Sequence, residues 1–274
     1  MRIVRAPLSG CFPVSHPITF SVATNDEAVL RENFLASPLA GLKQVQILLQ
    51  RDFRSAAAAY NDAIDKSEND LIVFAHQDIY FPAGWIEQLC DAVALLEKQD
   101  PNWGVLGCYG ITHDGQYRGH LCSSTQGIHG TAFDQPLPVQ TLDEIVLIIR
   151  KSSGLRFDES LPSFHFYGAD LCLEASKLGK QNYAICAPCI HNTRQGFVLP
   201  AVFYECYSYM RRKWLRALPV QTTCIRITKS NRDAYMRRLR ELHLRLVAKP
   251  PAFAPKTVDT LLRQLETSSA RAGV

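Results

Sequence analysis

The chain has 274 residues, enough for one large domain or for one domain with an appendage. Hydrophobic residues make up 47% and charged residues 20%, the composition of a soluble globular protein. No apolar run approaches the roughly 18 residues of a membrane helix, and the N-terminal residues contain no apolar segment of signal-peptide length. We therefore expect a cytoplasmic protein. The nine scattered cysteines favour buried free thiols over a disulfide framework.

The charge is divided unevenly along the chain. Residues 205–249 hold 12 Lys and Arg against 3 Asp and Glu, whereas residues 1–204 hold 15 against 21. This division predicts an α/β domain over residues 1–204 and a basic helical extension over residues 205–274.

The first half of the chain alternates between two periodicities. Strands are expected over residues 17–24, 44–49, 71–75 and 103–110, and helices over residues 27–35, 54–66 and about 85–98. This alternation predicts a doubly wound α/β sheet. No GxGxxG or GxxxxGK[ST] motif follows any strand, which argues against the usual dinucleotide fold and against a P-loop enzyme.

The second half is less regular. Residues 112–138 are rich in Gly, His, Ser and Thr and predict a long loop. A strand within residues 139–150, a turn at 157–161, a helix over 164–178 and a last short strand over 182–190 follow. The closely spaced Cys186 and Cys189 have no second pair at zinc-ligand spacing, so structural zinc is not favoured.

The basic extension carries an amphipathic helix. Residues 232–247 place apolar side chains on one stripe with arginines elsewhere, and a short helix is expected over residues 258–265. The basic helix could pack on the body, lie on an anionic membrane surface, or close over a bound diphosphate. Nucleic acid is not an expected partner, because no aromatic-basic module accompanies the charge.

Polar side chains follow two of the expected strands directly. The apolar run at residues 71–75 continues into His76, Gln77 and Asp78, and the first strand ends at Asn25 and Asp26. Ligands of open α/β sheets bind at the carboxyl ends of strands, and a carboxylate at a buried strand end needs a partner. These residues therefore predict a ligand site, with helix or turn capping as the alternative role for the acidic ones.

Five motifs in order resemble the family 2-like glycosyltransferases of the GT-A fold, in a bacterial branch whose metal motif reads His-Gln-Asp. They are Thr24-Asn25-Asp26, His76-Gln77-Asp78, Phe157-Asp158-Glu159, Asp170-Leu171-Cys172-Leu173, and His191. Residues 59–64 and 213–219 also resemble segments of that family. The resemblance covers about residues 17–195, and it implies a GT-A-like open sheet flanked by helices.

The resemblance also implies a divalent-metal site for a nucleotide sugar. Asp78 and His191 would bind the metal, and His76 could bind metal or ribose. An imidazole is a softer ligand than a carboxylate, so we expect manganese to serve at least as well as magnesium. Residues expected to contact the nucleotide are Thr24, Asn25, Asp26, His76 and Gln77.

The proton acceptor is less well defined. Asp170 is the first candidate for the base of an inverting transfer, and Glu174 shares its helical face. Common members of the family carry an Asp two residues before Asp170, where this chain has Gly168. Asp170 could then be a structural cap, and the base could be His165 or absent.

The expected function is transfer of a sugar from a nucleotide donor to a carbohydrate, lipid-linked or protein acceptor. The altered His-Gln-Asp motif and Gly168 leave open a non-catalytic nucleotide-sugar or glycan-binding module on the same fold. A nucleotidyltransferase is disfavoured, because no glycine-rich basic loop follows the first strand.

Overall fold

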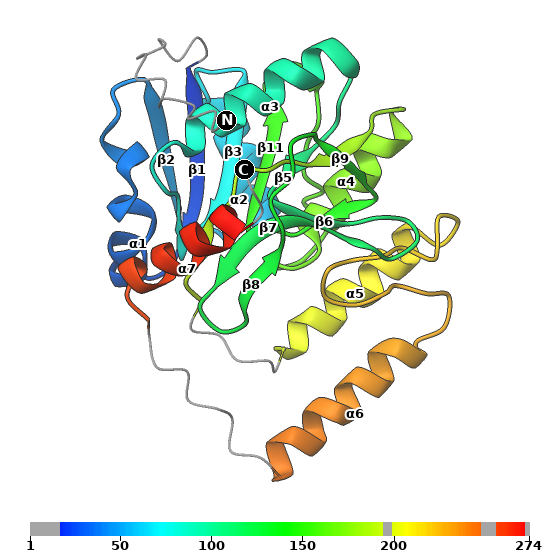
Figure 1. Ribbon diagram of the computed structural model, residues 1–274. Coiled ribbons are helices and arrows are strands. Elements are labelled where there is room, and N and C mark those ends of the chain that lie inside the picture. The colour runs from blue at the N-terminus through cyan, green and yellow to red at the C-terminus, as the bar shows by residue number, and fades with distance from the viewer. Residues whose placement is uncertain (1–16, 194–198, 248–255, 272–274) are drawn as a thin grey trace, which may run out of the picture.

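The computed structural model describes residues 17–193, 199–247 and 256–271 (Figure 1). Its strands are β1 Ile18–Thr24, β2 Val45–Arg51, β3 Leu71–His76, β4 Ile79–Tyr80, β5 Leu106–Gly107, β6 Tyr109–Ile111, β7 Tyr117–Ser123, β8 Gly127–Gly130, β9 Leu137–Val139, β10 Thr141–Leu142, β11 Val146–Arg150, β12 Asn182–Ala184 and β13 Ile190–His191. Its α-helices are α1 Glu27–Glu32, α2 Ala56–Lys66, α3 Trp85–Gln99, α4 Tyr167–Lys177, α5 Ala201–Lys213, α6 Arg232–Val247 and α7 Val258–Arg271.

The described residues form two sheets. The larger sheet has the order β2-β1-β3-β11-β5-β12-β9, and the smaller one has the order β10-β6-β7-β13-β4 with β8 paired to β7. Strand β1 runs parallel to β2 and β3, whereas β11 runs antiparallel to β3. The sheet is therefore mixed. Ala23 pairs with His76, so β1 and β3 end at the same edge.

The central strand is buried on both faces, as its apolar sequence predicts. Ile72 and Phe74 belong to the hydrophobic cluster that includes α2, α4 and α5. Val73 and Ala75 belong to the opposite cluster, which includes α1 and α3. Because side chains alternate across a strand, the two clusters lie on opposite faces of the larger sheet. This burial leaves the strand end as the place where polar residues reach solvent.

The α/β class and the early elements are confirmed, with shifted ends. Helix α1 stops at Glu32 and is followed by a 3₁₀ turn, Phe34–Ala36. The single strand expected over residues 103–110 is wrong, because the chain passes from β5 in the larger sheet to β6 in the smaller one. A Cβ on Gly107 would lie 2.8 Å from the Val146 carbonyl oxygen, so this crossing needs a glycine.

The loop expected over residues 112–138 is also wrong, because this segment contains β7, β8 and β9. Strand β7 lacks an alternating pattern because five consecutive residues, 119–123, are buried, His120 among them. Because β7 is covered on both faces and contains polar residues, its sequence shows neither an alternating pattern nor an apolar run. The strand expected over 182–190 divides into β12 and β13, which lie in different sheets.

The C-terminal part begins within the body of the protein. Helix α5 runs through the predicted boundary at residue 204 and buries Phe203, Cys206, Tyr207 and Met210. The division at 204 stays a prediction, but this helix packs in the same cluster as α2 and α4. Figure 1 shows α6 beyond α5, at the edge of the molecule.

Helix α7 packs on the smaller sheet and is longer than the helix expected over residues 258–265. Leu261 and Leu265 are buried against Cys122 and Ile190 of β7 and β13. No helix in the described residues is long and apolar enough to span a bilayer.

Candidate metal and nucleotide site

Three ligand-type side chains meet at the carboxyl end of β3. His76 is the last residue of this strand, and Asp78 follows in a short turn before β4. Strand β4 pairs antiparallel with β13, which sets His191 opposite Ile79 and therefore beside Asp78. The Asn192 N–H also donates to the Asp78 carbonyl at 2.9 Å. Local pairing thus joins residues that lie more than a hundred positions apart.

The cluster has the dimensions of a metal site. Asp78 Oδ2 lies 3.3 Å from His191 Nε2, and Asp78 Oδ1 lies 4.0 Å from His76 Nδ1. One ligand atom from each residue lies within 4.8 Å of the others, and this is the one such group among the described residues. Two imidazoles and a carboxylate suit manganese and other first-row divalent ions.

The charges within the cluster support one another. Burial alone would raise the pKa of Asp78, but the charge and hydrogen bond of His191 outweigh burial and lower it to about 2. Burial opposes protonation of His191, yet the neighbouring Asp78 raises the pKa of that imidazole. Burial lowers the pKa of His76, so this ring favours its neutral, metal-binding form.

A tyrosine from α4 orients the His76 ring. The Tyr167 hydroxyl lies 2.8 Å from His76 Nε2 and donates to the Glu144 carbonyl oxygen at 3.0 Å. Because the hydroxyl proton is used on that carbonyl, the imidazole Nε2–H must donate to the hydroxyl oxygen. The lone pair of Nδ1 then faces Asp78. A second hydrogen bond of this kind fixes the tautomer of metal-binding histidines.

Gln77 joins the ends of β1 and β3. Its amide oxygen accepts from the Thr24 hydroxyl at 2.7 Å and from the backbone N–H groups of Asn25 and Asp26 at 3.0 Å. Its amide nitrogen donates to the Asn25 side-chain oxygen at 2.8 Å. Gln77 therefore fixes the turn that follows β1. The exposed Asn25 and Asp26 lie beside the group of His76, Asp78 and His191, which we call the metal cluster.

Asp26 also has the capping role weighed from the sequence. Its carboxylate accepts from the Ala28 and Val29 N–H groups at the start of α1. The structure thus brings the predicted nucleotide residues together, with Asp26 and Gln77 engaged in structural hydrogen bonds.

Asp170 does not join the metal cluster. Its carboxylate is 1% exposed and accepts from Trp214 Nε1 at 2.7 Å and from Lys213 Nζ at 2.8 Å. Lys213 also contacts Asp158 at 2.7 Å and Glu174 at 3.0 Å. The three carboxylates and Lys213 form what we call the Lys213 cluster, which ties α5 to α4. Both catalytic candidates in this cluster, Asp170 and Glu174, are therefore engaged in ion pairs.

His165 lies apart from the Lys213 cluster. It is half-buried, its ring packs edge-on against Phe203 at 5.4 Å, and it lines a small cavity with Glu144. Burial lowers the pKa of His165, and the nearby His76 adds to this effect. Of the three catalytic candidates, His165 is the one beside the metal cluster.

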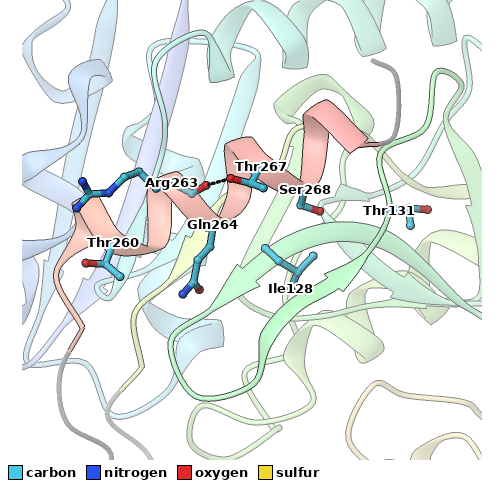
Figure 2. Close-up of a pocket in the computed structure, with 7 residues that line it drawn as sticks. All are labelled: Ile128, Thr131, Thr260, Arg263, Gln264, Thr267 and Ser268. Carbon is cyan, nitrogen blue, oxygen red and sulfur yellow. Dashed lines mark hydrogen bonds between the residues drawn. The ribbon is translucent and has the colours of Figure 1, made fainter.

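A groove of about 750 Å³ lies between α7 and β8. Figure 2 shows its polar lining from α7, with Ile128 and Thr131 on the opposite side. None of its lining residues belongs to the metal cluster. Cys186 and Cys189 likewise form no metal group: the Cys189 thiol faces Cys108 at 3.8 Å, and the Phe133 N–H donates to Cys186.

Two residues of this region carried no sequence signal. Tyr167 contacts a histidine 91 positions away, and Glu144 approaches α4 from the segment before β11. Short-range patterns such as caps and helical faces do not report contacts of this kind. The departure at Gly168 was the one available hint that this helix start differs.

The fold and the three-residue cluster define an α/β protein with a candidate divalent-metal site at the ends of its central strands. A family model described as "Glycosyltransferase like family" matches residues 22–199. The chain belongs to this family, and the resemblance inferred from its motifs is confirmed together with the glycosyltransferase type of α/β fold. The branch with a His-Gln-Asp motif stays a prediction.

One curated relative, the protein named "ATP synthase subunits region ORF 6" of Fuscovulum blasticum, is 27% identical over 165 residues. This match covers 58% of the present chain and 66% of the relative.

Several solved structures are similar at low identity. GalNAc-T7 with UDP, GalNAc and Mn²⁺ has a TM-score of 0.49 at 10% identity, covering 92% of this chain and 57% of that one. S. aureus TarS 1–349 with UDP-GlcNAc has 0.47 at 16%, covering 72% and 66%. The mannosyltransferase PcManGT of Pyrobaculum calidifontis with GDP-Man and Mn²⁺ has 0.45 at 12%, covering 94% and 75%.

Proposed function

We propose that this protein is a metal-dependent glycosyltransferase that moves a sugar from a nucleotide-sugar donor to a carbohydrate, lipid-linked or protein acceptor, with inversion. The observation that carries the proposal is the meeting of His76, Asp78 and His191 within 4.8 Å, at the strand end of a chain from this family. The experiment below tests this site directly.

The metal role follows from the chemistry of the leaving group. Breaking the bond between sugar and diphosphate develops negative charge on the diphosphate, which a divalent cation bound to these residues would neutralise. Manganese or magnesium fits a carboxylate, and the two imidazoles favour manganese. Asp78 would be an acceptor-only ligand, because its low pKa keeps it ionised at neutral pH.

The nucleotide would lie over the end of β1. Thr24, Asn25 and Asp26 sit at the same sheet edge as the metal cluster, and Gln77 braces their backbone. In this proposal Asn25 and Asp26 contact the nucleotide with groups not used in the cap, and His76 contributes to both nucleotide and metal binding. Gln77 acts by positioning the turn.

The first prediction concerns Asp78. Wild-type protein with UDP or GDP and Mn²⁺ should show a metal-dependent rise in Tm, because binding at about 100 times Kd stabilises a protein by roughly 2.7 kcal/mol. Asp78→Asn should lose this rise while keeping the Tm of the free protein. Thermal shift with and without Mn²⁺ measures both.

Asp91→Asn is the matched control, because Asp91 is an exposed carboxylate of α3 that does not belong to the cluster. It should respond as the wild type does. If no nucleoside diphosphate raises the Tm of the wild type in the presence of metal, the proposed function is wrong.

A non-catalytic binding module remains the alternative, supported by Gly168 and by the engagement of Asp170 with Lys213. The two functions differ in turnover. A transferase should release nucleoside diphosphate slowly from its donor sugar even without acceptor, whereas a binding module should release none.

We also propose that α6 contacts an anionic membrane surface at the cytoplasmic face. Five apolar side chains of this helix are exposed between 38% and 62%: Tyr235, Met236, Leu239, Leu242 and Leu244. Arginines lie on the same helix, and it packs on α5 through contacts such as Tyr204 with Glu241 at 2.8 Å. An exposed apolar stripe with flanking arginines suits anionic headgroups. The free thiols of the described cysteines suit a cytoplasmic location.

A further inference from the structure

A small cavity of about 60 Å³ lies near His76, since two of its lining residues, Asp143 and His165, interact electrostatically with that imidazole. The segment before β11, the start of α4 and residues 222–224 enclose it. Its titratable lining residues are Asp143, Glu144, His165 and Cys224. This volume is enough for one or two water molecules, and so for a hydroxyl group.

The start of α4 has no side chain where Glu144 approaches it. A Cβ on Gly168 would lie 3.0 Å from Glu144 Cγ, so the glycine leaves the room that this side chain occupies. The backbone N–H groups of Phe166 and Gly168 lower the pKa of Glu144, which places them near its carboxylate. A helix N-terminus favours a carboxylate in this position. Glu144 therefore supplies the acidic group at a helix start that has none at residue 168.

The same helix start also fixes the metal cluster. Tyr167, the residue before Gly168, holds His76 at 2.8 Å and bonds to the carbonyl of Glu144 at 3.0 Å. The backbone of Glu144 is thus two hydrogen bonds from a metal-binding imidazole.

The neighbouring acidic groups are already engaged. Asp170 and Glu174 are paired with Lys213. Asp143 accepts from the Ile145 N–H at 3.2 Å and from the Thr223 hydroxyl at 2.6 Å. Asp143 and Glu144 both line the cavity, but Asp143 is held by the Thr223 hydroxyl, whereas Glu144 accepts no side-chain hydrogen bond within the described residues. Glu144 is therefore the carboxylate left to meet an entering hydroxyl.

We propose that Glu144 is the general base of the transfer, an assignment that rests on the proposed function. The acceptor hydroxyl enters the cavity and its O–H bond breaks, with the proton passing to the Glu144 carboxylate. The hydroxyl oxygen forms a new bond to the anomeric carbon. The bond from that carbon to the diphosphate breaks, and its electron pair leaves with the nucleoside diphosphate.

The surroundings of Glu144 suit this role. Burial raises the pKa of Glu144 well above its ordinary value, and the charge of Asp143 adds to this, while the two backbone N–H groups oppose it. A base is most effective when its pKa lies near the working pH, so the raised pKa makes Glu144 a stronger proton acceptor than an exposed carboxylate.

Donor hydrolysis tests the assignment without a known acceptor, because water can take the place of the hydroxyl. The full chain with Mn²⁺ is incubated with UDP-GlcNAc and, separately, with GDP-mannose, and the release of UDP or GDP is measured. Glu144→Gln should slow release at least about 100-fold, the range for loss of a general base. Its Kd for UDP or GDP with Mn²⁺ should stay within about twofold of the wild type.

Three further variants test whether the effect is specific to the Glu144 carboxylate. Glu144→Asp keeps the carboxylate but shortens the side chain, and should retain part of the activity. Glu68→Gln removes an exposed carboxylate after α2 and should leave hydrolysis unchanged. His165→Asn removes the imidazole that lines the cavity and should reduce hydrolysis less than Glu144→Gln does.

The outcomes are distinct. A wild type that binds no nucleotide with metal overturns the proposed function itself. A wild type that binds but hydrolyses neither donor contradicts the base, since a positioned base beside a water-sized cavity should activate water. Equal hydrolysis by the wild type and Glu144→Gln, or a larger loss in His165→Asn, overturns the assignment while leaving the metal site intact.

Discussion

At the scale of single residues, Tyr167 links the metal cluster to α4. Its hydroxyl accepts from His76 and donates to Glu144, so one hydroxyl selects the imidazole tautomer. Tyr167→Phe should weaken Mn²⁺ binding by about 10- to 100-fold, the usual effect of losing a hydrogen bond behind a metal ligand. Isothermal titration with Mn²⁺ and a nucleoside diphosphate measures this change.

Tyr207→Phe is a close control for that experiment. Tyr207 is 1% exposed and belongs to the same hydrophobic cluster as Tyr167. Its hydroxyl has no hydrogen-bond partner within the described residues. Removing it should leave metal affinity unchanged. Similar losses in both variants would show that Tyr167 acts through general packing rather than through His76.

At the scale of elements, the contact between α4 and α5 depends on Lys213. This lysine forms ion pairs with Asp158, Asp170 and Glu174 from the last turn of α5, and its side chain is only 19% exposed. Lys213→Met should lower the free energy of unfolding by about 3 kcal/mol, because it leaves buried carboxylates without a counter-charge. Urea unfolding at pH 7 gives this value.

Lys177→Met provides the comparison. Lys177 also pairs with Glu174 but is 63% exposed, so its loss should change stability by less than about 0.5 kcal/mol. Burial opposes ionisation of Asp158, yet Lys213 and Tyr209 hold its pKa at about 2. The Asp158 part of the Lys213→Met effect should therefore be full above about pH 4 and shrink as the pH falls toward 2. Equal effects of the two lysine variants would contradict the role of the Lys213 cluster.

The same cluster explains several family-like motifs in structural terms. The aspartate of Phe157-Asp158-Glu159 and the one that opens Asp170-Leu171-Cys172-Leu173 both bind Lys213. The Lys213-Trp214 pair of the later segment supplies both donors to Asp170. These motifs therefore fix how α4 and α5 meet, and α4 in turn presents Tyr167 and Gly168 to the site.

At the scale of the whole molecule, Figure 1 shows α6 beyond α5, at the edge of the molecule. This helix is rich in arginine and exposes five apolar side chains. Replacing both Leu239 and Leu242 by Glu should abolish co-sedimentation with vesicles that contain phosphatidylserine, because it removes apolar burial and adds repulsion. Leu178→Glu alters a leucine directly after α4 that is even more exposed than Leu239 and Leu242, and it should not affect binding. A wild type that ignores anionic vesicles would refute the membrane contact.

The sequence by itself predicted the α/β class and the central strand, and its motifs named His76, Asp78 and His191, which the structure brings together. Their metal role stays a prediction. An unbroken apolar run followed by His76 and Asp78 announces a buried strand that ends at a site, because local patterns record burial and strand ends. The sequence did not predict the strands within residues 112–138. Strand β7 is buried on both faces and contains polar and small residues, so its apolar residues do not alternate.

Only the tertiary structure decided which acidic side chains form ion pairs. The sequence ranked Asp170 first because a carboxylate at a helix start is a common pattern, but the partners that occupy it come from α5, 43 and 44 residues away. Glu144 reaches the bare helix start at Gly168 from another element. Such pairings depend on how elements pack, and packing between distant segments leaves no short-range signal in the chain.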